Sequence, residues 1–402
     1  MIPATFLTNL ECSSCRECFD ADEPHTVCPR CGKVLLARYD LQAAKSVMTK
    51  QLIARREATM WRYRELLPVK NAKNVISLGE GMTPVYRLQR IGKDLGLPNL
   101  WIKDEGANPT GSFKSRGMGV ALSRAKEFGI KEVAVPSAGN AGGALAAYAA
   151  RAGMRAHVFM PTDTPRVNIG EVQAFGAEAV LVEGTISDAA KMMSEINKHR
   201  GWFDCSTLKE PYRLEGKKTM GYEIAEQFGW QFPDVIIYPT GGGTGLIGMW
   251  KAFEEAEELG WITGRSPVEK ACKRPRMVVV QSSGCAPIVR AFQTGQVDST
   301  FWEDARTVAS GLRVPKAFAD YMILKVLYES GGFAVAVDDG EIISDMNYLA
   351  RTEGIFACPE GAATLTALRA LAAKKLVRES ETVLLLNTGS GYKYTELFVN
   401  GA

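Results

Sequence analysis

The segment with the clearest chemical potential spans residues 111–117 and reads Gly-Ser-Phe-Lys-Ser-Arg-Gly. It follows a predicted strand at residues 100–105 and precedes a run with helical spacing of apolar residues, so Lys114 lies where a loop enters a helix. Partial burial beside Phe113 and small residues would lower the pKa of such a lysine and free an amine nucleophile. A solvated surface lysine is the alternative for a single residue of this kind.

A second polar loop, residues 137–143, follows a predicted strand and opens a helix rich in small residues. Backbone amides at a helix start face an anion, and the side chain of Asn140 can donate or accept a hydrogen bond. These features predict a binding site for a carboxylate. The alternative is a tight strand-to-helix turn in which the glycines serve only close packing.

Two further loops follow apolar strands. Residues 240–245 read TGGGTG before a predicted helix, and free amides at such a start suit a phosphate. The loop matches neither GxxxxGK[ST] nor GxGxxG, which argues against a P-loop or a dinucleotide site. Residues 387–391 read NTGSG, which would place Thr388 at the sheet edge where α/β folds bind ligands. A lysine, an asparagine, a phosphate loop and a terminal hydroxyl together describe a pyridoxal phosphate site.

Five of the nine cysteines lie within residues 11–31. They include two CxxC pairs, Cys12 with Cys15 and Cys28 with Cys31. Two such pairs can hold one tetrahedral zinc ion, and four thiolates without an open position make a structural site. Reduced, metal-free cysteines are the alternative, and Cys18 or His25 could replace one ligand.

The composition limits the class of protein. A chain of 402 residues is long enough for two or three domains, and 46% hydrophobic with 23% charged residues is ordinary for a globular protein. The net charge of +3 gives no nucleic-acid footprint. We find no secretory signal and no apolar run long enough for a membrane span. We therefore expect a cytoplasmic protein with no nucleic-acid or membrane partner.

From residue 75 onward, strand-like and helix-like segments alternate. Strands are predicted at residues 100–105, 132–137, 157–161, 179–183, 234–240, 277–281 and 382–387. This alternation is typical of doubly wound α/β domains with mainly parallel sheets. Residues 41–67 contain no Gly or Pro and predict one long helix that ends at Pro68, and residues 262–276 predict a surface loop.

The motifs occur in the order found in the tryptophan-synthase-β-like (fold type II) pyridoxal phosphate enzymes, and the chain resembles the threonine synthase family among them. Residues 80–84 (EGMTP), 108–114 (NPTGSFK) and 211–219 (PYRLEGKKT) resemble that family's EGxTP, NPTGSFK and PYRxEGxKT. The resemblance implies two doubly wound parallel-sheet domains with an N-terminal zinc-ribbon-like segment. The implied domains are residues 1–40 (ribbon), 41–117 with 206–402 (large, cofactor-binding) and 118–205 (small, mobile).

The resemblance also implies a role for each site residue. Lys114 would form the Schiff base, Phe113 would pack by the ring, and Asn140 would contact the ring hydroxyl. The cofactor phosphate would be held by Gly241, Gly242, Gly243, Thr244 and Gly245. Thr388 would meet the pyridine nitrogen. The substrate carboxylate would be held by Ser137 and Asn140, and the substrate phosphate by Arg213.

The implied activity is that of a pyridoxal-phosphate-dependent carbon–oxygen lyase, converting O-phosphohomoserine and water into L-threonine and phosphate. Three positions depart from the family pattern: Ser115 replaces an aspartate, Ala141 replaces a threonine, and the phosphate loop lacks asparagines. The alternatives are a threonine/serine dehydratase, a diaminopropionate ammonia-lyase, an O-phosphoserine-dependent enzyme such as cysteate synthase, or a zinc-ribbon binding module with an inactive body. For Arg213, an ion pair with Glu210 or Glu215 is the alternative. We expect a homodimer.

Overall fold

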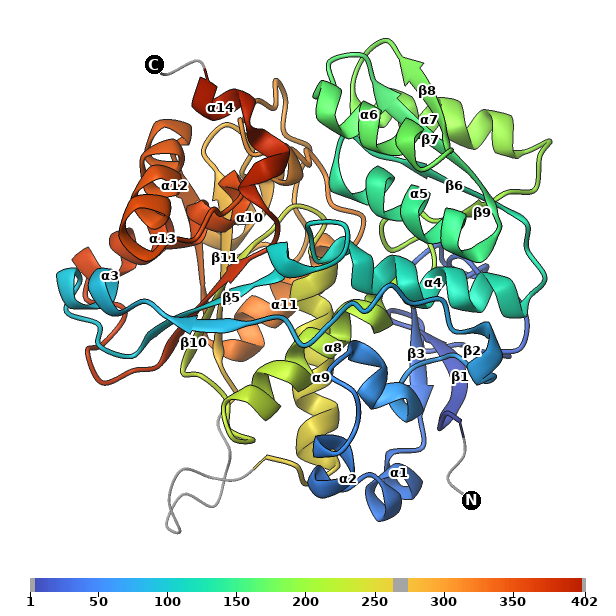
Figure 1. Cartoon of the computed structure of the whole chain (residues 1–402), viewed down its shortest axis with the longest axis horizontal. Helices are drawn as coiled ribbons and strands as arrows, with labels where there is room; N and C mark the ends of the chain where they lie inside the picture. The colour runs from blue at the N-terminus through green and yellow to red at the C-terminus, as the bar shows by residue number, and fades with distance from the viewer. Residues whose placement is uncertain (1–3, 263–273, 400–402) are drawn as a thin grey trace. The chain divides into compact units, whose positions relative to one another are not determined.

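The computed structural model describes residues 4–262 and 274–399 (Figure 1). This part of the chain divides into two compact units. Unit 1 comprises the described part of Met1–Met82, with Lys114–Gly221 and Glu254–Trp261; unit 2 comprises Thr83–Phe113, Tyr222–Phe253 and the described part of Ile262–Ala402. Most of the predicted loop at residues 262–276 lies outside the described residues. Within them, no helix has the length and apolar character needed to cross a membrane.

Unit 2 is built on a six-stranded sheet. Its strands are β4 (Val85–Arg87), β5 (Leu100–Asp104), β10 (Val235–Pro239), β11 (Arg276–Ser282), β12 (Phe333–Val337) and β13 (Val383–Asn387). Their order is β12-β11-β10-β13-β5-β4, and all neighbours are parallel except β4 and β5. The strand β13 therefore lies between β10 and β5, with Leu385 opposite both Ile237 and Ile102.

Apolar composition explains why this sheet lies inside unit 2. Every residue of β10 and β13 is buried, as expected for parallel strands covered on both faces.

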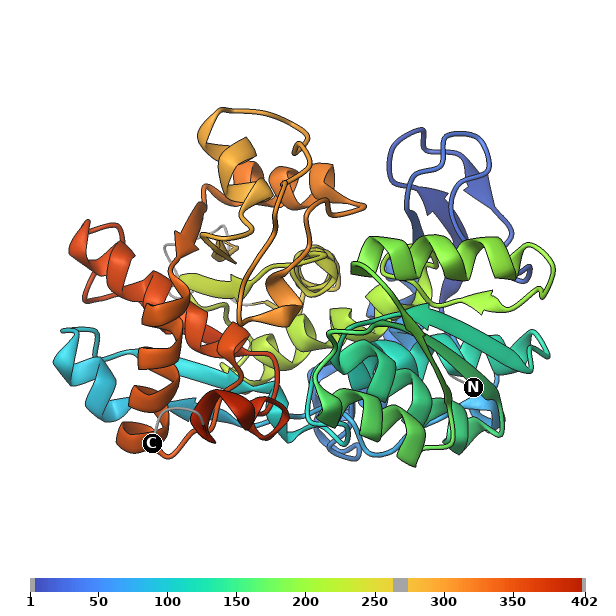
Figure 2. The same ribbon diagram turned by 90° about the horizontal axis from the view of Figure 1, so that it is seen from above.

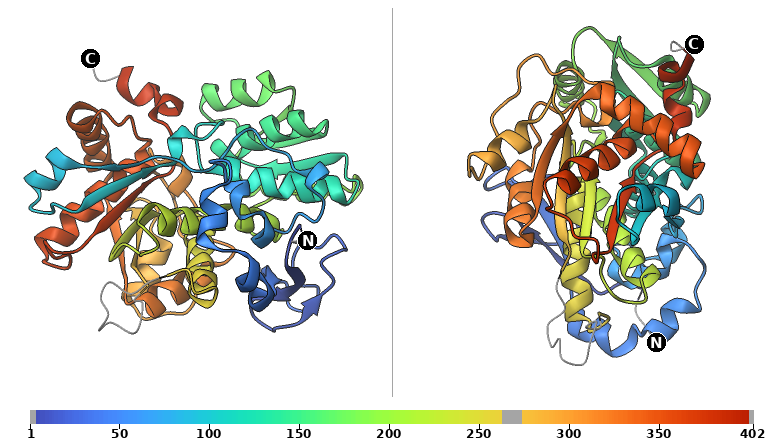
Figure 3. Two further views of the ribbon diagram at one scale, coloured as in Figure 1. Left: turned by 60° about the horizontal axis from the view of Figure 1, so that its bottom comes forward. Right: turned by 90° about the vertical axis from the view of Figure 1, so that its left-hand side faces the viewer.

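The helices of unit 2 are α3 (Gln89–Asp94), α9 (Thr244–Glu258), α10 (Pro287–Gln293), α11 (Asp320–Ser330), α12 (Asp339–Glu353), α13 (Pro359–Ala373) and α14 (Glu396–Val399). The helices α8 and α9 each extend into both units. The helix α13 packs across β10 to β13, with α12 beside it (Figures 1 and 3). Short 3-10 turns are η3 (Glu105–Ala107), η4 (Ser310–Leu312) and η5 (Gly391–Tyr394).

Unit 1 contains a four-stranded parallel sheet. Its strands are β6 (Glu132–Pro136), β7 (Arg155–Pro161), β8 (Glu178–Val182) and β9 (Phe203–Asp204), in the order β8-β7-β6-β9. Its helices are α4 (Lys114–Glu127), α5 (Asn140–Ala152), α6 (Arg166–Ala174), α7 (Ile186–Asn197) and α8 (Tyr212–Gln227). Both α5 and α7 pack on β6 and β7. The predicted doubly wound α/β architecture with parallel sheets is confirmed.

The N-terminal segment of unit 1 is a small antiparallel sheet. Its strands are β1 (Leu7–Cys12), β2 (Cys18–Phe19) and β3 (Leu35–Tyr39), in the order β2-β1-β3. Figure 2 shows the loops of this dark blue segment projecting beyond its strands. A sheet of this size has too little apolar surface to be stable alone, which is the usual reason for a metal ligand set in such a segment.

The predicted helix at residues 41–67 is wrong. The chain forms α1 (Leu41–Val47), α2 (Lys50–Ala54) and the 3-10 helix η1 (Met60–Leu66), followed by η2 (Ala72–Asn74). The hydroxyl of Thr49 accepts the amide of Leu52 and starts a new helix, and Thr59 is extended. Threonine hydroxyls offer the backbone an alternative partner, so the absence of Gly and Pro does not make a segment one helix.

Candidate active site

Three of the predicted site segments meet at the carboxyl edge of the sheet in unit 2. Because β10, β13 and β5 are parallel neighbours, the loops that follow them lie side by side. The amide of Phe113 donates to the carbonyl oxygen of Thr388 at 3.1 Å, and its ring lies edge-on to Tyr238 with centroids 6.3 Å apart. The structure thus brings Phe113 and Thr388 together with the strand that leads into the TGGGTG loop.

The TGGGTG loop presents unused backbone donors. Within residues 4–262 and 274–399, the amides of Gly241 to Thr244 donate to no protein acceptor, and the 15-residue helix α9 begins at Thr244. A Cβ atom at Gly241 would lie 2.2 Å from the carbonyl oxygen of Gly311. Gly243 has φ = 75°, and a Cβ there would lie 2.3 Å from Ile323 Cδ1. Glycine is therefore required, and the free amides at a helix N-terminus form a cradle that fits a phosphate.

The side chain of Thr388 has a neutral environment. Its hydroxyl lies 3.8 Å from the thiol of Cys358, which is also 3.6 Å from Asn387 Oδ1. Burial, followed by the nearby charge of Glu360, raises the pKa of the Cys358 thiol well above its usual value, so the thiol stays protonated. No sequence pattern pointed to Cys358, because an isolated cysteine before a helix is more often a packing residue.

In unit 1, the helices that carry Lys114 and Arg213 cross at two glycines. Lys114 is the first residue of α4, and a Cβ at Gly216 of α8 would lie 2.0 Å from the carbonyl oxygen of Arg116. A Cβ at Gly117 would lie 3.3 Å from Arg213 Cβ and 3.1 Å from Lys217 Cε. The two cationic side chains, one helical turn apart, therefore lie against Gly117, itself one turn beyond Lys114.

The guanidinium of Arg213 is buried without a full set of partners. Its side chain is 1% exposed, one Nη donates to the carbonyl oxygen of Cys205, and Nε and Nη2 have no hydrogen-bond partner among the described residues. Glu210 instead accepts the amides of Tyr212 and Arg213 at 2.6 and 3.0 Å. Burial raises the pKa of Glu210 to about 7. The buried guanidinium thus retains donors for a further acceptor.

The predicted alternative of an ion pair for Arg213 is not found as a direct salt bridge among the described residues, although the charge of Glu210 opposes the lowering of the Arg213 pKa by burial. Neither Glu210 nor Glu215 forms a salt bridge with it in the described chain. The Glu215 carboxylate lies 2.6 Å from Lys218 Nζ and accepts the hydroxyl of Tyr39 at 2.7 Å. Lys218 also pairs with Glu255 at 2.9 Å. This buried network joins the N-terminal sheet to α8. It gives Lys218 carboxylate partners that differ from the surroundings of its neighbour Lys217.

Lys217 lies next to the predicted site residue Arg213 on α8, and the sequence motifs did not single it out. It is 1% exposed, and its pKa is lowered well below the usual lysine value by burial, then by Arg213 and Lys114. This repulsion places Lys217 electrostatically beside both predicted site residues. The motif PYRxEGxKT leaves its position open, and its spacing of four residues from Arg213 on a helix is the signal that could have identified it.

The predicted carboxylate-binding loop, residues 137–143, lies at the carboxyl edge of the sheet in unit 1. The strands β6 and β9 are parallel neighbours. The loop that follows β6 and the segment that runs from β9 to Arg213 therefore both start at the same edge of the sheet. The hydroxyl of Ser137 accepts the amides of Gly139 and Gly142 at 3.2 and 3.0 Å and so shapes the loop. Asn140 Oδ1 is buried and has no partner in the described chain. This orphaned oxygen fits a ligand that offers a hydroxyl or amine.

Glu171 is a second residue that the sequence reasoning missed. A Cβ at Gly143 would lie 2.0 Å from Glu171 Oε2, so this carboxylate lies against the first turn of α5. A carboxylate at a helix N-terminus is favourable. The carboxylate of Glu171 therefore already acts as an anion near this loop. Glu171 lies on α6, outside any recognisable motif.

Residues of the other two family motifs, EGMTP and NPTGSFK, form buried hydrogen bonds. Glu80 is buried and accepts the hydroxyl of Tyr148 at 2.6 Å and the indole N–H of Trp61 at 2.7 Å. In unit 2, Thr83 and Asn108 both donate to the carboxylate of Glu105, at 2.6 and 2.9 Å. These contacts order the chain on either side of the loop that ends at Phe113.

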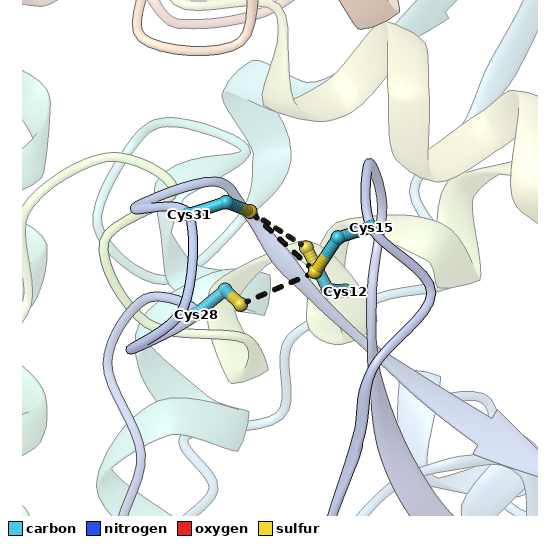
Figure 4. Close-up of side chains that lie close together, drawn as sticks. All are labelled: Cys12, Cys15, Cys28 and Cys31. Carbon is cyan, nitrogen blue, oxygen red and sulfur yellow. Dashed lines mark hydrogen bonds between the residues drawn. The ribbon is translucent and has the colours of Figure 1, made fainter.

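The four predicted metal ligands form one cluster (Figure 4). Sulfur–sulfur distances are 3.4 Å for Cys12–Cys31, 3.7 Å for Cys15–Cys28 and 3.6 Å for Cys15–Cys31. A tetrahedral zinc with bonds of about 2.3 Å separates its ligands by about 3.8 Å, so the donor set fits this ion. Cys18, one of the predicted alternatives, instead points to the carbonyl oxygen of Arg16.

Comparisons with known proteins agree with this geometry. The family model described as pyridoxal-phosphate dependent enzyme matches residues 76–389. The threonine synthase of Methanocaldococcus jannaschii is 36% identical over 383 residues, which cover 95% of this chain and 92% of the relative. That of Methanosarcina acetivorans is 35% identical over 384 residues, covering 95% and 91%.

Solved structures show the same fold. The diaminopropionate ammonia lyase from Escherichia coli has a TM-score of 0.67 at 17% identity and covers 81% of this chain and 89% of its own. A maize serine racemase has a TM-score of 0.66 at 21% identity and covers 79% and 91%. At these identities the likeness confirms the predicted fold class.

Proposed function

The chain belongs to the family of pyridoxal-phosphate-dependent enzymes, and from this premise we propose that it is a threonine synthase, converting O-phosphohomoserine and water into L-threonine and phosphate. The observation that carries the proposal is Arg213, a buried arginine whose Nε and Nη2 have no partner in the described chain. Burying a cation with unused donors is costly unless an anion meets it, and a phosphate monoester accepts two parallel hydrogen bonds from a guanidinium.

We propose the cofactor roles that the family resemblance implies, residue by residue. The amides of Gly241 to Gly245 would hold its phosphate, Phe113 would lie beside its ring, and the orphaned oxygen of Asn140 would accept from its ring hydroxyl. Thr388 offers the pyridine nitrogen a neutral hydroxyl, which leaves that nitrogen without a full proton. When bound, pyridoxal phosphate supplies the electron sink that acidifies the substrate C–H bonds.

The protein residues then divide the remaining work. Lys114 would remove one proton from the substrate Cα and one from Cβ, deliver a proton to Cγ after the phosphate has left, and return a proton to Cα at the end. Arg213 would hold the phosphate until the Cγ–O bond breaks and the phosphate departs with the bonding electrons. Water adds its oxygen to Cβ, which yields threonine. The loop from Ser137 to Asn140 would hold the substrate carboxylate during these steps.

Two alternatives differ in their use of Arg213. The substrates of dehydratases and of diaminopropionate ammonia-lyase carry no phosphate, so they would leave Nε and Nη2 of the buried guanidinium without an acceptor. An O-phosphoserine-dependent enzyme would use it as a threonine synthase does. Product analysis separates these classes.

The deciding experiment supplies the purified, cofactor-loaded chain with O-phosphohomoserine, O-phosphoserine together with sulfite, threonine, serine or 2,3-diaminopropionate in parallel. We expect equal amounts of threonine and phosphate from O-phosphohomoserine, and no comparable rate of keto-acid or sulfonate formation from the others. Keto acid from threonine without threonine formation from O-phosphohomoserine would establish a dehydratase instead.

We propose that Cys12, Cys15, Cys28 and Cys31 hold one structural zinc per chain, because the sulfurs already have tetrahedral spacing. Burial opposes ionisation of Cys12, but the amides of Ser14 and Cys15 outweigh it and lower the pKa of that thiol to about 7. Replacing Cys31 by serine should lower the melting temperature while kcat changes less than twofold. Cys18→Ser is the matched control and should keep the metal. Fresh protein without zinc would contradict the proposal.

Two expectations from the sequence remain predictions. We expect residues 118–205 to close over bound substrate, which hydrogen exchange with and without substrate would test. We also expect a homodimer, which light scattering would test.

A further inference from the structure

Glu360 lies in the first turn of α13, outside the residues assigned to the reaction. Its side chain is buried, and one carboxylate oxygen, Oε1, accepts the amide of Gly311 at 2.7 Å and the hydroxyl of Tyr394 at 2.8 Å. That hydroxyl also lies 3.2 Å from Ser310 Oγ. Donors from η4 and η5 thus converge on a single buried oxygen, which fixes both turns to the start of α13.

Gly311 lies between Glu360 and the TGGGTG loop. The amide of Gly311 donates to Glu360, and a Cβ at Gly311 would lie 2.8 Å from Glu360 Oε1. The carbonyl oxygen of Gly311 lies so close to Gly241 that a Cβ there would approach it to 2.2 Å. Gly311 is therefore one wall of the loop, and Glu360 holds this wall in place.

The start of α13 also reaches the other end of the proposed cofactor site. Cys358 is the N-cap of α13, and its thiol accepts the amide of Gly361 at 3.3 Å and lies 3.8 Å from Thr388 Oγ1. A Cβ at Gly361 would lie 2.0 Å from Asn387 Oδ1, so the helix start is packed tightly on the end of β13. One helical turn therefore touches both the proposed contact of the pyridine nitrogen and the wall of the phosphate loop.

We infer that Glu360 is a positioning residue for the cofactor phosphate: its bond to Gly311 holds the wall against which the loop keeps the amides of Gly241 to Thr244 free for the anion. This inference rests on the proposed assignment of that loop to the cofactor phosphate. Without the bond, η4 can move away and the loop gains other conformations, so a preorganised site is lost. Contacts to the rest of the cofactor should change little.

The primary test compares pyridoxal phosphate with pyridoxal, which lacks the phosphate, by equilibrium dialysis from the cofactor-loaded protein. Glu360→Ala should raise Kd at least about tenfold for pyridoxal phosphate and less than about twofold for pyridoxal. Glu360→Gln keeps one acceptor oxygen and should stay within about threefold of the parent for both. Glu341→Ala, which removes an exposed acid from the first turn of α12, is the matched control and should bind as the parent does. Equal losses for the two ligands, or no loss for either, would overturn the inference.

A double-mutant cycle tests the contact itself. The φ of Gly241 is not positive, so the cost of Gly241→Ala comes from its clash with Gly311. This change should weaken binding of pyridoxal phosphate about tenfold in the parent and less than about threefold in Glu360→Ala, where Gly311 is free to withdraw. Gly243→Ala clashes with Ile323 instead, so its cost should be the same in both backgrounds. An unchanged cost of Gly241→Ala would refute the role of Glu360.

Tyr394→Phe covers the case in which Glu360→Ala fails to fold. It removes only a hydroxyl, so Glu360 keeps Gly311 as its partner but loses the second bond. We expect about threefold weaker binding of pyridoxal phosphate, unchanged binding of pyridoxal and a smaller cost of Gly241→Ala. A variant that matches the parent in all three measurements would contradict the inference.

The two proposals fail in different ways. If the parent binds pyridoxal as tightly as pyridoxal phosphate, the assignment of the loop to the cofactor phosphate is refuted, and with it the role of Glu360. If the parent prefers pyridoxal phosphate and makes threonine, but Glu360→Ala keeps that preference, only the role of Glu360 is refuted.

Discussion

The two anion sites that we propose for this protein use opposite chemistry. In unit 2, Gly241 to Thr244 offer free backbone amides, while in unit 1 Arg213 offers a buried side-chain cation. Amides carry no charge that a proton can remove, so a site made of them holds its anion across a wide pH range. Buried cations depend on their neighbours and on pH. The first arrangement suits a resident phosphate, and the second suits a phosphate that arrives and leaves with each turnover.

The largest expected effect comes from Lys114, the lysine that we propose forms the Schiff base. Lys114→Ala should abolish turnover and the visible absorbance of lysine-bound pyridoxal phosphate, because no other lysine lies in a matching motif. Both anion sites should survive this change, so the variant should still bind free cofactor and sulfate. Covalently retained cofactor after gel filtration would refute the assignment of Lys114.

The next effect concerns the cationic site alone. Arg213→Ala removes two charge-assisted hydrogen bonds of about 1.5–3 kcal/mol each, so kcat/KM for O-phosphohomoserine should fall roughly a hundredfold or more. Cofactor affinity should not change. Arg200→Ala, at an exposed position, is the control for arginine loss. Unchanged discrimination between phosphorylated and unphosphorylated substrates would remove threonine synthase as the leading function.

A smaller effect concerns the backbone site. Gly243→Ala adds a Cβ at φ = 75° and only 2.3 Å from Ile323 Cδ1, so the loop must shift and cofactor affinity should fall about tenfold, close to 1.4 kcal/mol. Gly295→Ala, at φ = 67° with no atom within 4 Å, isolates the cost of the backbone angle. We expect that control to lose some stability and no cofactor. Equal loss of cofactor in both variants would show that phosphate binding by the TGGGTG loop does not depend on the close packing at Gly243.

The smallest effect is a pH dependence that only the cationic site should show. The pKa of Glu210 is raised to about 7 by burial, so its carboxyl gains a negative charge as pH rises through 7. This titration weakens anion binding, so sulfate affinity should fall a few-fold between about pH 6 and 8. Glu210→Gln should flatten the lower part of this profile, whereas an unchanged profile would exclude Glu210.

The sequence predicted the parallel sheets well because their strands have a simple physical signature. Continuous apolar runs such as residues 235–239 and 383–387, followed by glycine loops, mark buried strands whose carboxyl ends bind ligands. The short strands β1, β2 and β9 have no such run. Their pairing depends on the cysteine cluster or on a neighbouring strand, which no local pattern reveals.

The site was predictable where its chemistry lies in the backbone. Glycine is required at Gly241 and Gly243 by close approach and by φ, and such requirements are visible as a motif. The cationic site was predictable only in part. Burial of Lys217, the orphaned nitrogens of Arg213 and the carboxylate of Glu171 against α5 all depend on contacts between elements far apart in sequence.

The glycine crossing of α4 and α8 has a practical consequence for protein engineering. Because a Cβ at Gly216 would lie 2.0 Å from the carbonyl oxygen of Arg116, the two helix backbones are held at a fixed spacing that side chains elsewhere do not set. The residues at positions 213 and 217 can therefore be exchanged as a cassette, with the start of α4 left in place. Libraries that seek new leaving groups, such as sulfate esters or carboxylates, should vary these two positions and keep both glycines.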